Sequence, residues 1–148
     1  MKNQELKNLE KQARYVFHGS ENIIKIFEPR QALTIVNGKQ VPDGEPAIFA
    51  SPFVDYAIFM AIINKTNCPK SFWSECIWGD KKLKFTTTKE TLEQLNENSK
   101  GYIYVFNKND FKKIRPNEWV SYKKVKPIKR IKVNWSDFTK EVEIIESN

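Results

Sequence analysis

The feature that most constrains the fold is an uninterrupted apolar run over residues 56–63, shortly after the pair Ser51-Pro52. Serine is a favoured helix cap and proline suits the first turn of a helix, so a helix is predicted from this pair to about Asn64. Its apolar side chains spread over more than one side: Phe53, Ala57, Met60 and Ala61 on one, and Tyr56, Phe59 and Ile63 on another. Such a helix must be covered on more than one face.

Strand signals lie on both sides of this helix in the chain. Short β-rich segments at residues 15–17 and 47–50 precede it, and residues 102–106 form the strongest strand candidate by propensity. Further strands are predicted at residues 83–85, 111–114, 119–124, 128–134 and 142–145, whereas residues 72–77 fit either a helix or a strand. With helices early and antiparallel strands late, the order predicts an α+β fold.

Turn and cap signals place the remaining elements. A helix is predicted over residues 2–12, and another from Ser20 through Phe27, ended by Pro29. Asn37-Gly38 predicts a tight hairpin between residues 34–36 and 40–41. Thr88 is expected to cap a helix over residues 90–96, and a one-turn helix is expected at residues 136–138.

Chain length and composition limit the class of protein. A chain of 148 residues is expected to form one domain, residues 1–148. Two cysteines and a single histidine are too few ligands for a zinc site, so no metal is expected and both thiols should be free. No apolar stretch is long enough for a membrane helix, and the polar first residues do not resemble a signal peptide, so a cytoplasmic location without membrane contact is expected.

Positive charge is concentrated late in the chain. The net charge is +7, and residues 108–132 are rich in lysine and arginine. Such a segment attracts polyanions, including nucleic acid or a diphosphate, but it is equally consistent with a solvated basic face. The charge alone does not decide between the two.

Two short segments carry the candidate chemistry. His18, the only histidine, is followed by Gly19 and Ser20 where the first strand ends, and the second segment is residues 48–51. The chain lacks the dinucleotide-binding glycine motif, the phosphate-binding loop and the hydrolase nucleophile motif. Because backbone groups stay open where a strand gives way to glycine, the two segments are expected to form the floor and wall of a nucleotide pocket.

Together these segments resemble the ADP-ribosyltransferase superfamily, especially the branch of poly(ADP-ribose) polymerases and RNA 2′-phosphotransferases. In that branch one strand carries His-Gly-Ser or His-Gly-Thr, and a later strand similar to Tyr-Phe-Ala leads into a helix. In the transferases a glutamate on a late strand completes the set. The resemblance covers roughly residues 15–59, and residues 101–133 more loosely. It implies a split antiparallel β-sheet core with flanking helices, which binds NAD and transfers ADP-ribose to an unknown acceptor, a nucleic acid or a small molecule.

The resemblance also implies a role for individual residues. The backbone of Gly19 would hold the nicotinamide carboxamide, and His18 would bond a hydroxyl of the adenine-side ribose. Ser20 would reach the nicotinamide ribose or cap a helix, and Phe59 would stack on the nicotinamide ring. Glu118 would stabilise the positive charge that develops when the glycosidic bond breaks. The remaining cofactor-binding candidates are Arg30, as a diphosphate clamp, and Phe49 and Ser51 of the second segment.

The chain departs from the transferase pattern at two positions. Ile48 stands where these enzymes usually have tyrosine, and Pro116 stands two residues before Glu118 where a second catalytic-type acid or a glutamine would be expected. One alternative is therefore a catalytically inactive module that binds nucleic acid. A second is an RNA 2′-phosphotransferase-like protein, in which Arg14 and Arg30 would hold a 2′-phosphate. A third is an interaction protein with a vestigial pocket.

Overall fold

The structure is a computed structural model that describes residues 3–146, and within them it contains three α-helices and eleven strands. The helices are α1 (Gln4–Lys11), α2 (Val54–Ile62) and α3 (Lys89–Glu93). The strands are β1 (Tyr15–Ser20), β2 (Leu33–Val36), β3 (Lys39–Pro42), β4 (Ile48–Ala50), β5 (Ser74–Gly79), β6 (Lys82–Thr88), β7 (Lys100–Asn107), β8 (Lys112–Arg115), β9 (Glu118–Ser121), β10 (Lys129–Asn134) and β11 (Val142–Ile145). Single 3-10 turns lie at η1 (Lys108–Asp110) and η2 (Trp135–Asp137). This confirms the α+β class.

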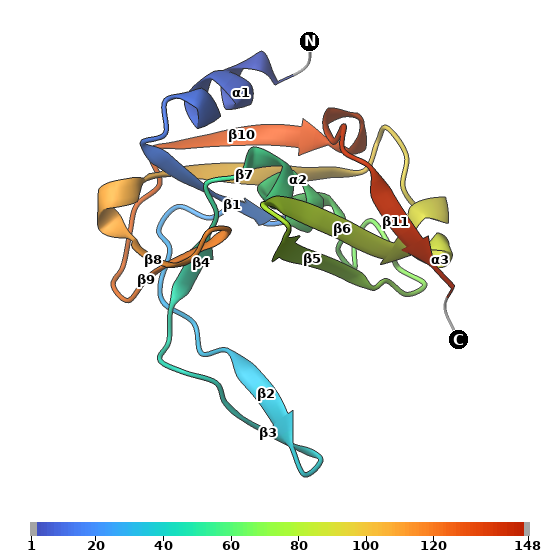
Figure 1. The fold of residues 1–148 in the computed structure, drawn as a ribbon, viewed down its shortest axis with the longest axis horizontal. Coiled ribbons are helices and arrows are strands. Elements are labelled where there is room, and N and C mark those ends of the chain that lie inside the picture. Colours follow the sequence, from blue (N-terminus) through green and yellow to red (C-terminus); the bar gives the residue numbers. More distant parts are fainter. Residues whose placement is uncertain (1–2, 147–148) are drawn as a thin grey trace.

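Two groups of strands form one side of the molecule. The sheet β1-β7-β10 and the sheet β4-β9-β8 are antiparallel, and a single bridge between Phe17 and Ser51 joins β1 to the end of β4. The third sheet, β11-β6-β5, lies on the other side of α2 (Figure 1). Its β11 runs parallel to β6, whereas all other pairings between named strands are antiparallel. None of the helices within residues 3–146 has the length and apolar character needed to cross a membrane.

Helix α2 is buried on two sides, as its apolar run predicted. Ala57, Ile58 and Ala61 are at most 1% exposed and belong to the cluster formed with β1, β7 and β10. Phe59 points to the other side, where its ring centroid lies 5.0 Å from that of Phe85 on β6. The helix is therefore a central layer between the sheet β1-β7-β10 and the sheet β11-β6-β5.

The backbone of α2 lies directly on β1 and β7. A Cβ atom built on Gly19 would lie 2.0 Å from the carbonyl oxygen of Ala57, and one built on Gly101 would lie 2.4 Å from that of Ala61. Real Cβ atoms do not approach backbone oxygens so closely, so only glycine fits at either position. Glycines on the strands and alanines on the helix thus set the distance between the layers.

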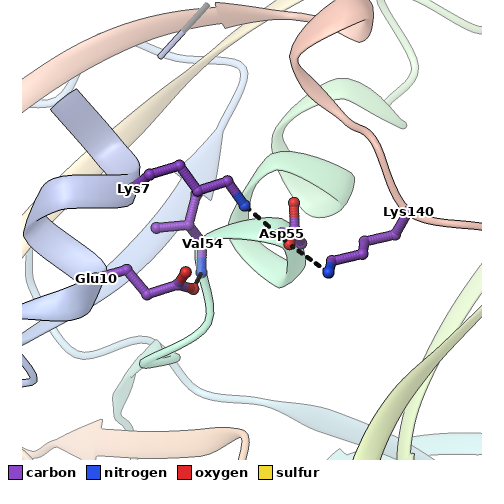
Figure 2. Close-up of polar contacts among 5 residues, drawn as sticks. All are labelled: Lys7, Glu10, Val54, Asp55 and Lys140. Atoms are coloured by element: carbon purple, nitrogen blue, oxygen red, sulfur yellow. Dashed lines mark hydrogen bonds and ion pairs between the residues drawn. The ribbon is translucent and has the colours of Figure 1, made fainter. Parts of the chain in front are cut away.

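The start of α2 is fixed by two polar groups. Ser51 Oγ accepts a hydrogen bond of 3.2 Å from the Phe53 N–H, and Glu10 of α1 accepts one of 2.7 Å from the Val54 N–H (Figure 2). Helix termini leave such N–H groups without partners inside the helix. The helix therefore begins at Val54, slightly later than the Ser51-Pro52 pair predicted.

The helix predicted from Ser20 through Phe27 is absent. Ser20 ends β1, and the segment that follows is irregular. The Tyr104 hydroxyl accepts a hydrogen bond from the Ile24 N–H and donates one to the Asn22 carbonyl, each 2.6 Å long. Phe27 forms a bridge with Val125 instead. These distant partners satisfy backbone groups that a helix would have bonded internally, so tertiary contacts override the local signal.

Other local predictions are confirmed. Asn37 and Gly38 have φ values of 53° and 76° and close the β2–β3 hairpin, as their sequence predicted. Thr88 caps α3 by accepting a hydrogen bond from the Thr91 N–H. The undecided segment at residues 72–77 overlaps strand β5.

Candidate functional site

Two cavities meet beside the end of β1. The larger, here called the loop cavity, has a volume of about 680 Å³ and lies under the irregular segment of residues 22–32. The smaller, here called the inner cavity, has a volume of about 230 Å³ and lies between β1, β4, the first turns of α2 and the β8–β9 turn. His18 and Phe49 line both cavities, so they stand at the junction.

The backbone of Gly19 faces the inner cavity because the β1–β4 ladder stops early. Phe17 and Ser51 exchange two hydrogen bonds, of 2.7 and 2.8 Å. In a continuous antiparallel ladder, the next bonded pair would be Gly19 and Phe49. That pair is not formed, and the Phe49 carbonyl instead lies 2.6 Å from His18 Nδ1. Since backbone groups alternate along a strand, the N–H and C=O of Gly19 point to the same edge as those of Phe17.

His18 is held in one protonation state by its surroundings. A carbonyl oxygen can only accept, so the contact with Phe49 places the ring proton on Nδ1. Burial lowers the pKa of His18 below its ordinary value of 6.5; the Phe49 carbonyl raises it in part, and the positive charge of Arg30 lowers it further. The ring is therefore neutral at pH 7, with Nε2 available to accept a hydrogen bond.

The lowered pKa of His18 predicts a specific pH dependence of stability. The unfolded chain binds the proton more tightly than the folded chain, so stability is lost as the pH falls below 6.5. We expect the urea midpoint of the wild type to fall more between pH 7 and pH 5.5 than that of His18→Gln. Because His18 is the only histidine, its ring resonances can be titrated directly by NMR. A measured pKa at or above 6.5 would contradict the burial described here.

Glu118 and Asn117 lie on the far wall of the inner cavity. The Glu118 carboxylate is 3.3 Å from Arg115 Nη1, and its side chain is 27% exposed. Asn117 is only 7% exposed, and its Oδ1 atom is buried without a hydrogen-bond partner within residues 3–146. Buried polar atoms are normally bonded, so this acceptor is a candidate partner for a donor outside the described residues.

Tyr56 is the aromatic residue of α2 that lines the inner cavity, whereas Phe59 lies elsewhere. Phe59 is fully buried and packs on Phe85 and Phe138, so it does not reach the position that the resemblance implied for a stacking ring. Burial raises the pKa of Tyr56, and the nearby Cys76 and Glu118 raise it further, while Arg115 opposes them. Its phenol therefore stays protonated at neutral pH. The two rings are three residues apart in one apolar run, but one faces the cavity and the other faces the core.

The remaining predicted residues fall into two groups. Ser20 and Arg30 line the loop cavity, and Phe49 lines both cavities while remaining 40% exposed. Ser51 is fully buried and lines neither cavity, because its backbone bonds Phe17 and its hydroxyl bonds the start of α2. Sequence reasoning missed Tyr56 and Asn117; the only signal for Tyr56 was a polar hydroxyl within an apolar run.

Comparisons with protein-family models, with curated proteins and with solved structures found no match for this chain. Any conclusion about function therefore rests on the geometry of the site. Within residues 3–146 no group of three or more histidine, cysteine, aspartate or glutamate side chains is placed to hold a metal ion. Both cysteines are free, and burial raises the pKa of Cys76 to about 12, so this thiol is not a reactive thiolate at neutral pH.

Proposed function

We propose that this protein binds NAD across the two cavities and transfers its ADP-ribose group to an acceptor. The observation that carries the proposal is that His18, Gly19 and Glu118 line one cavity although they come from distant parts of the chain. The sheet β1-β7-β10, bridged to β4-β9-β8 and separated by α2 from β11-β6-β5, also fits the split-sheet architecture of ADP-ribosyltransferases.

The inner cavity suits the nicotinamide end of NAD. A carboxamide needs one donor and one acceptor, and the N–H and C=O of Gly19 supply this pair at the open edge of β1. The ring then lies against Tyr56. The Oδ1 atom of Asn117 accepts a hydrogen bond from an amide or hydroxyl of the ligand, which gives this buried atom its partner.

The loop cavity suits the adenosine end. Its volume of about 680 Å³ falls within the range of ligand pockets. A ribose hydroxyl donates to Nε2 of the neutral His18, at the junction of the two cavities. Arg30 lines the same cavity and offers a guanidinium to the diphosphate.

The chemistry needed from the protein is stabilisation of positive charge. The bond between the ribose C1′ and the nicotinamide nitrogen breaks with its electron pair going to the nitrogen, so nicotinamide leaves neutral and the ribose becomes cation-like. Glu118, on the wall of the same cavity, stabilises that cation and accepts a hydrogen bond from the ribose 2′-hydroxyl. A nucleophilic atom of the acceptor then forms the new bond to C1′ and loses its proton. The acceptor is a nucleic acid or a small molecule.

A second candidate is NAD binding without transfer. Arg115 pairs with the Glu118 carboxylate, which neutralises part of the charge that catalysis would use. Ile48, where the transferases usually have tyrosine, is 3% exposed and adds an apolar side chain to the wall of the loop cavity. Binding alone needs neither a free carboxylate nor that tyrosine.

The binding step is tested by calorimetric titration with NAD. We expect Tyr56→Leu to weaken NAD binding by about two- to tenfold, because stacking contributes about 0.5–1.5 kcal/mol beyond burial. Tyr122→Leu is the matched control, since Tyr122 is 50% exposed and lines neither cavity. No binding by the wild type, or an equal loss in both variants, would contradict the proposed site.

A further inference from the structure

A third cavity opens beside the first turn of α2. Its volume is about 590 Å³, and it lies between α1, the start of α2 and the β5–β6 hairpin. Phe53 and Asp55 line it, whereas the adjacent residues Tyr56 and Ala57 line the inner cavity. The two cavities therefore flank the same stretch of α2. The third is called the lysine cavity here because five lysines line it: Lys7, Lys81, Lys82, Lys108 and Lys140.

The lysine cavity has a positive charge that the protein does not balance. Five lysines face two acids, Glu10 and Asp55, which leaves a formal charge of +3. Both acids are engaged: Glu10 bonds the backbone of α2, and the Asp55 carboxylate lies between Lys7 at 3.3 Å and Lys140 at 3.9 Å (Figure 2). Lys81 and Lys82 have no acidic partner within residues 3–146. An anion is thus the missing counter-charge.

The same cavity offers a flat aromatic surface. The rings of Phe53 and Trp78 are stacked, with centroids 5.4 Å apart and planes inclined by 20°. Both line the cavity, as does Tyr15, and all three are only partly buried. A planar ligand can extend such a stack. Nucleobases stack on aromatic side chains in this way, and all four bases can do so because each has a flat π-face.

One buried acceptor in the cavity has no partner. Asp55 is 6% exposed, and both of its lysine contacts are made by Oδ2. Its Oδ1 atom is buried and has no hydrogen-bond partner within residues 3–146. A ligand that carries an amine or hydroxyl donor besides its negative charge would satisfy this atom.

From charge, stacking surface and unpartnered acceptor together, we infer that the lysine cavity binds a nucleotide unit. The base stacks beside Phe53 and Trp78, its phosphate faces Lys81 and Lys82, and a base amine or ribose hydroxyl donates to Asp55. A volume of about 590 Å³ accommodates such a unit. The unit is either a free mononucleotide or one residue of a single-stranded nucleic acid. This site is separate from the proposed NAD site and does not depend on NAD being bound or cleaved.

The test is binding of a fluorescein-labelled single-stranded DNA dodecamer, its RNA counterpart and AMP to the full chain over a range of salt concentrations. The double variant Lys81→Gln/Lys82→Gln removes two charges from the cavity. The matched control, Lys112→Gln/Lys113→Gln, removes two charges from β8, whose lysines are also exposed but lie outside the cavity. Trp78→Leu removes the stacking surface while keeping an apolar side chain.

We expect the cavity variants to weaken binding by about tenfold and the control to leave it almost unchanged. For a strand, loss of two phosphate contacts should also make the slope of log affinity against log salt about 1.4 units shallower. AMP that binds as tightly as the strand identifies a free nucleotide as the ligand, whereas a much tighter strand identifies nucleic acid. Equal losses in the cavity and control variants, or no binding of any probe at low salt, would overturn the inference.

Discussion

Gly19→Ala is expected to destabilise the protein by about 3 kcal/mol or more, at the upper end of overpacking effects. The added Cβ atom would lie 2.0 Å from the Ala57 carbonyl oxygen and 2.8 Å from the Ala61 nitrogen. Both are backbone atoms of α2, so no side-chain rotation can relieve the clash. The helix would have to move away from β1, and this would loosen its packing against the sheets on both of its sides.

The measurement is urea denaturation followed by circular dichroism, with Gly79→Ala as the matched control. A Cβ atom on Gly79 would meet nothing within 4 Å, so this variant should change the stability by no more than about 0.5 kcal/mol. Gly101→Ala should resemble Gly19→Ala, because its Cβ atom would lie 2.4 Å from the Ala61 carbonyl oxygen. If Gly19→Ala were as stable as Gly79→Ala, α2 could not lie on β1 as described.

The packing of α2 on β1 explains why residue 19 is a glycine. The resemblance gave Gly19 a role only through its backbone, whereas the structure shows that the Ala57 carbonyl occupies the space a side chain would need. The missing side chain of Gly19 thus allows α2 to pack closely on β1. Its backbone N–H and C=O point at right angles to that direction and remain at the strand edge for a ligand. One residue can meet both requirements because these groups point in different directions.

Elements defined by local chemistry were predictable from the sequence. The β2–β3 hairpin follows from two residues that adopt positive φ, and the start of α3 follows from one threonine side chain. The two-sided burial of α2 follows from its apolar run, since no other arrangement removes those side chains from water. For the hairpin and the helix cap, the decisive interaction lies within a few residues in the chain; for α2, the apolar run itself is the signal.

Features that depend on distant residues were not predictable. The backbone of the segment after Ser20 is hydrogen-bonded to the hydroxyl of Tyr104, which is far away in sequence. This segment therefore does not form the predicted helix. Tyr56 and Phe59 share one apolar run, and only the surrounding layers decide which ring faces a cavity. The pairing of Phe49 with His18 likewise arises only once β4 is in place beside β1.

The positions of the charges in the late basic segment, residues 108–132, were also not predictable from the sequence. Its charge suggested one patch, but two of its lysines pair with acids from the early part of the chain: Lys124 with Glu28, and Lys129 with Glu5. Of this segment only Lys108 reaches the lysine cavity, whose other lysines come from earlier or later parts of the chain. Charge density along the sequence is therefore a poor guide to where positive side chains meet in space.

Glu118→Gln is expected to reduce the rate of NAD cleavage by about 10²–10³-fold, the usual effect of removing one group that stabilises transition-state charge. Glutamine keeps the size of the side chain and an oxygen for Arg115, so stability and NAD affinity should change little. The effect should thus appear in kcat rather than in KM, because the lost interaction belongs to the cation-like state. The measurement is nicotinamide release by the purified protein.

Glu75→Gln is the matched control, since Glu75 is an exposed acid on β5 and lines none of the three cavities described above. It should retain the wild-type rate. If Glu118→Gln cleaves NAD as fast as Glu75→Gln, the charge in the transition state is stabilised elsewhere and the catalytic role of Glu118 is wrong. If the wild type binds NAD by calorimetry but releases no nicotinamide, either alone or with single-stranded nucleic acid added as acceptor, binding without transfer is favoured. In that case the Arg115–Glu118 pair explains the inactivity, and Arg115→Gln, which frees the carboxylate, is the variant in which cleavage should be sought.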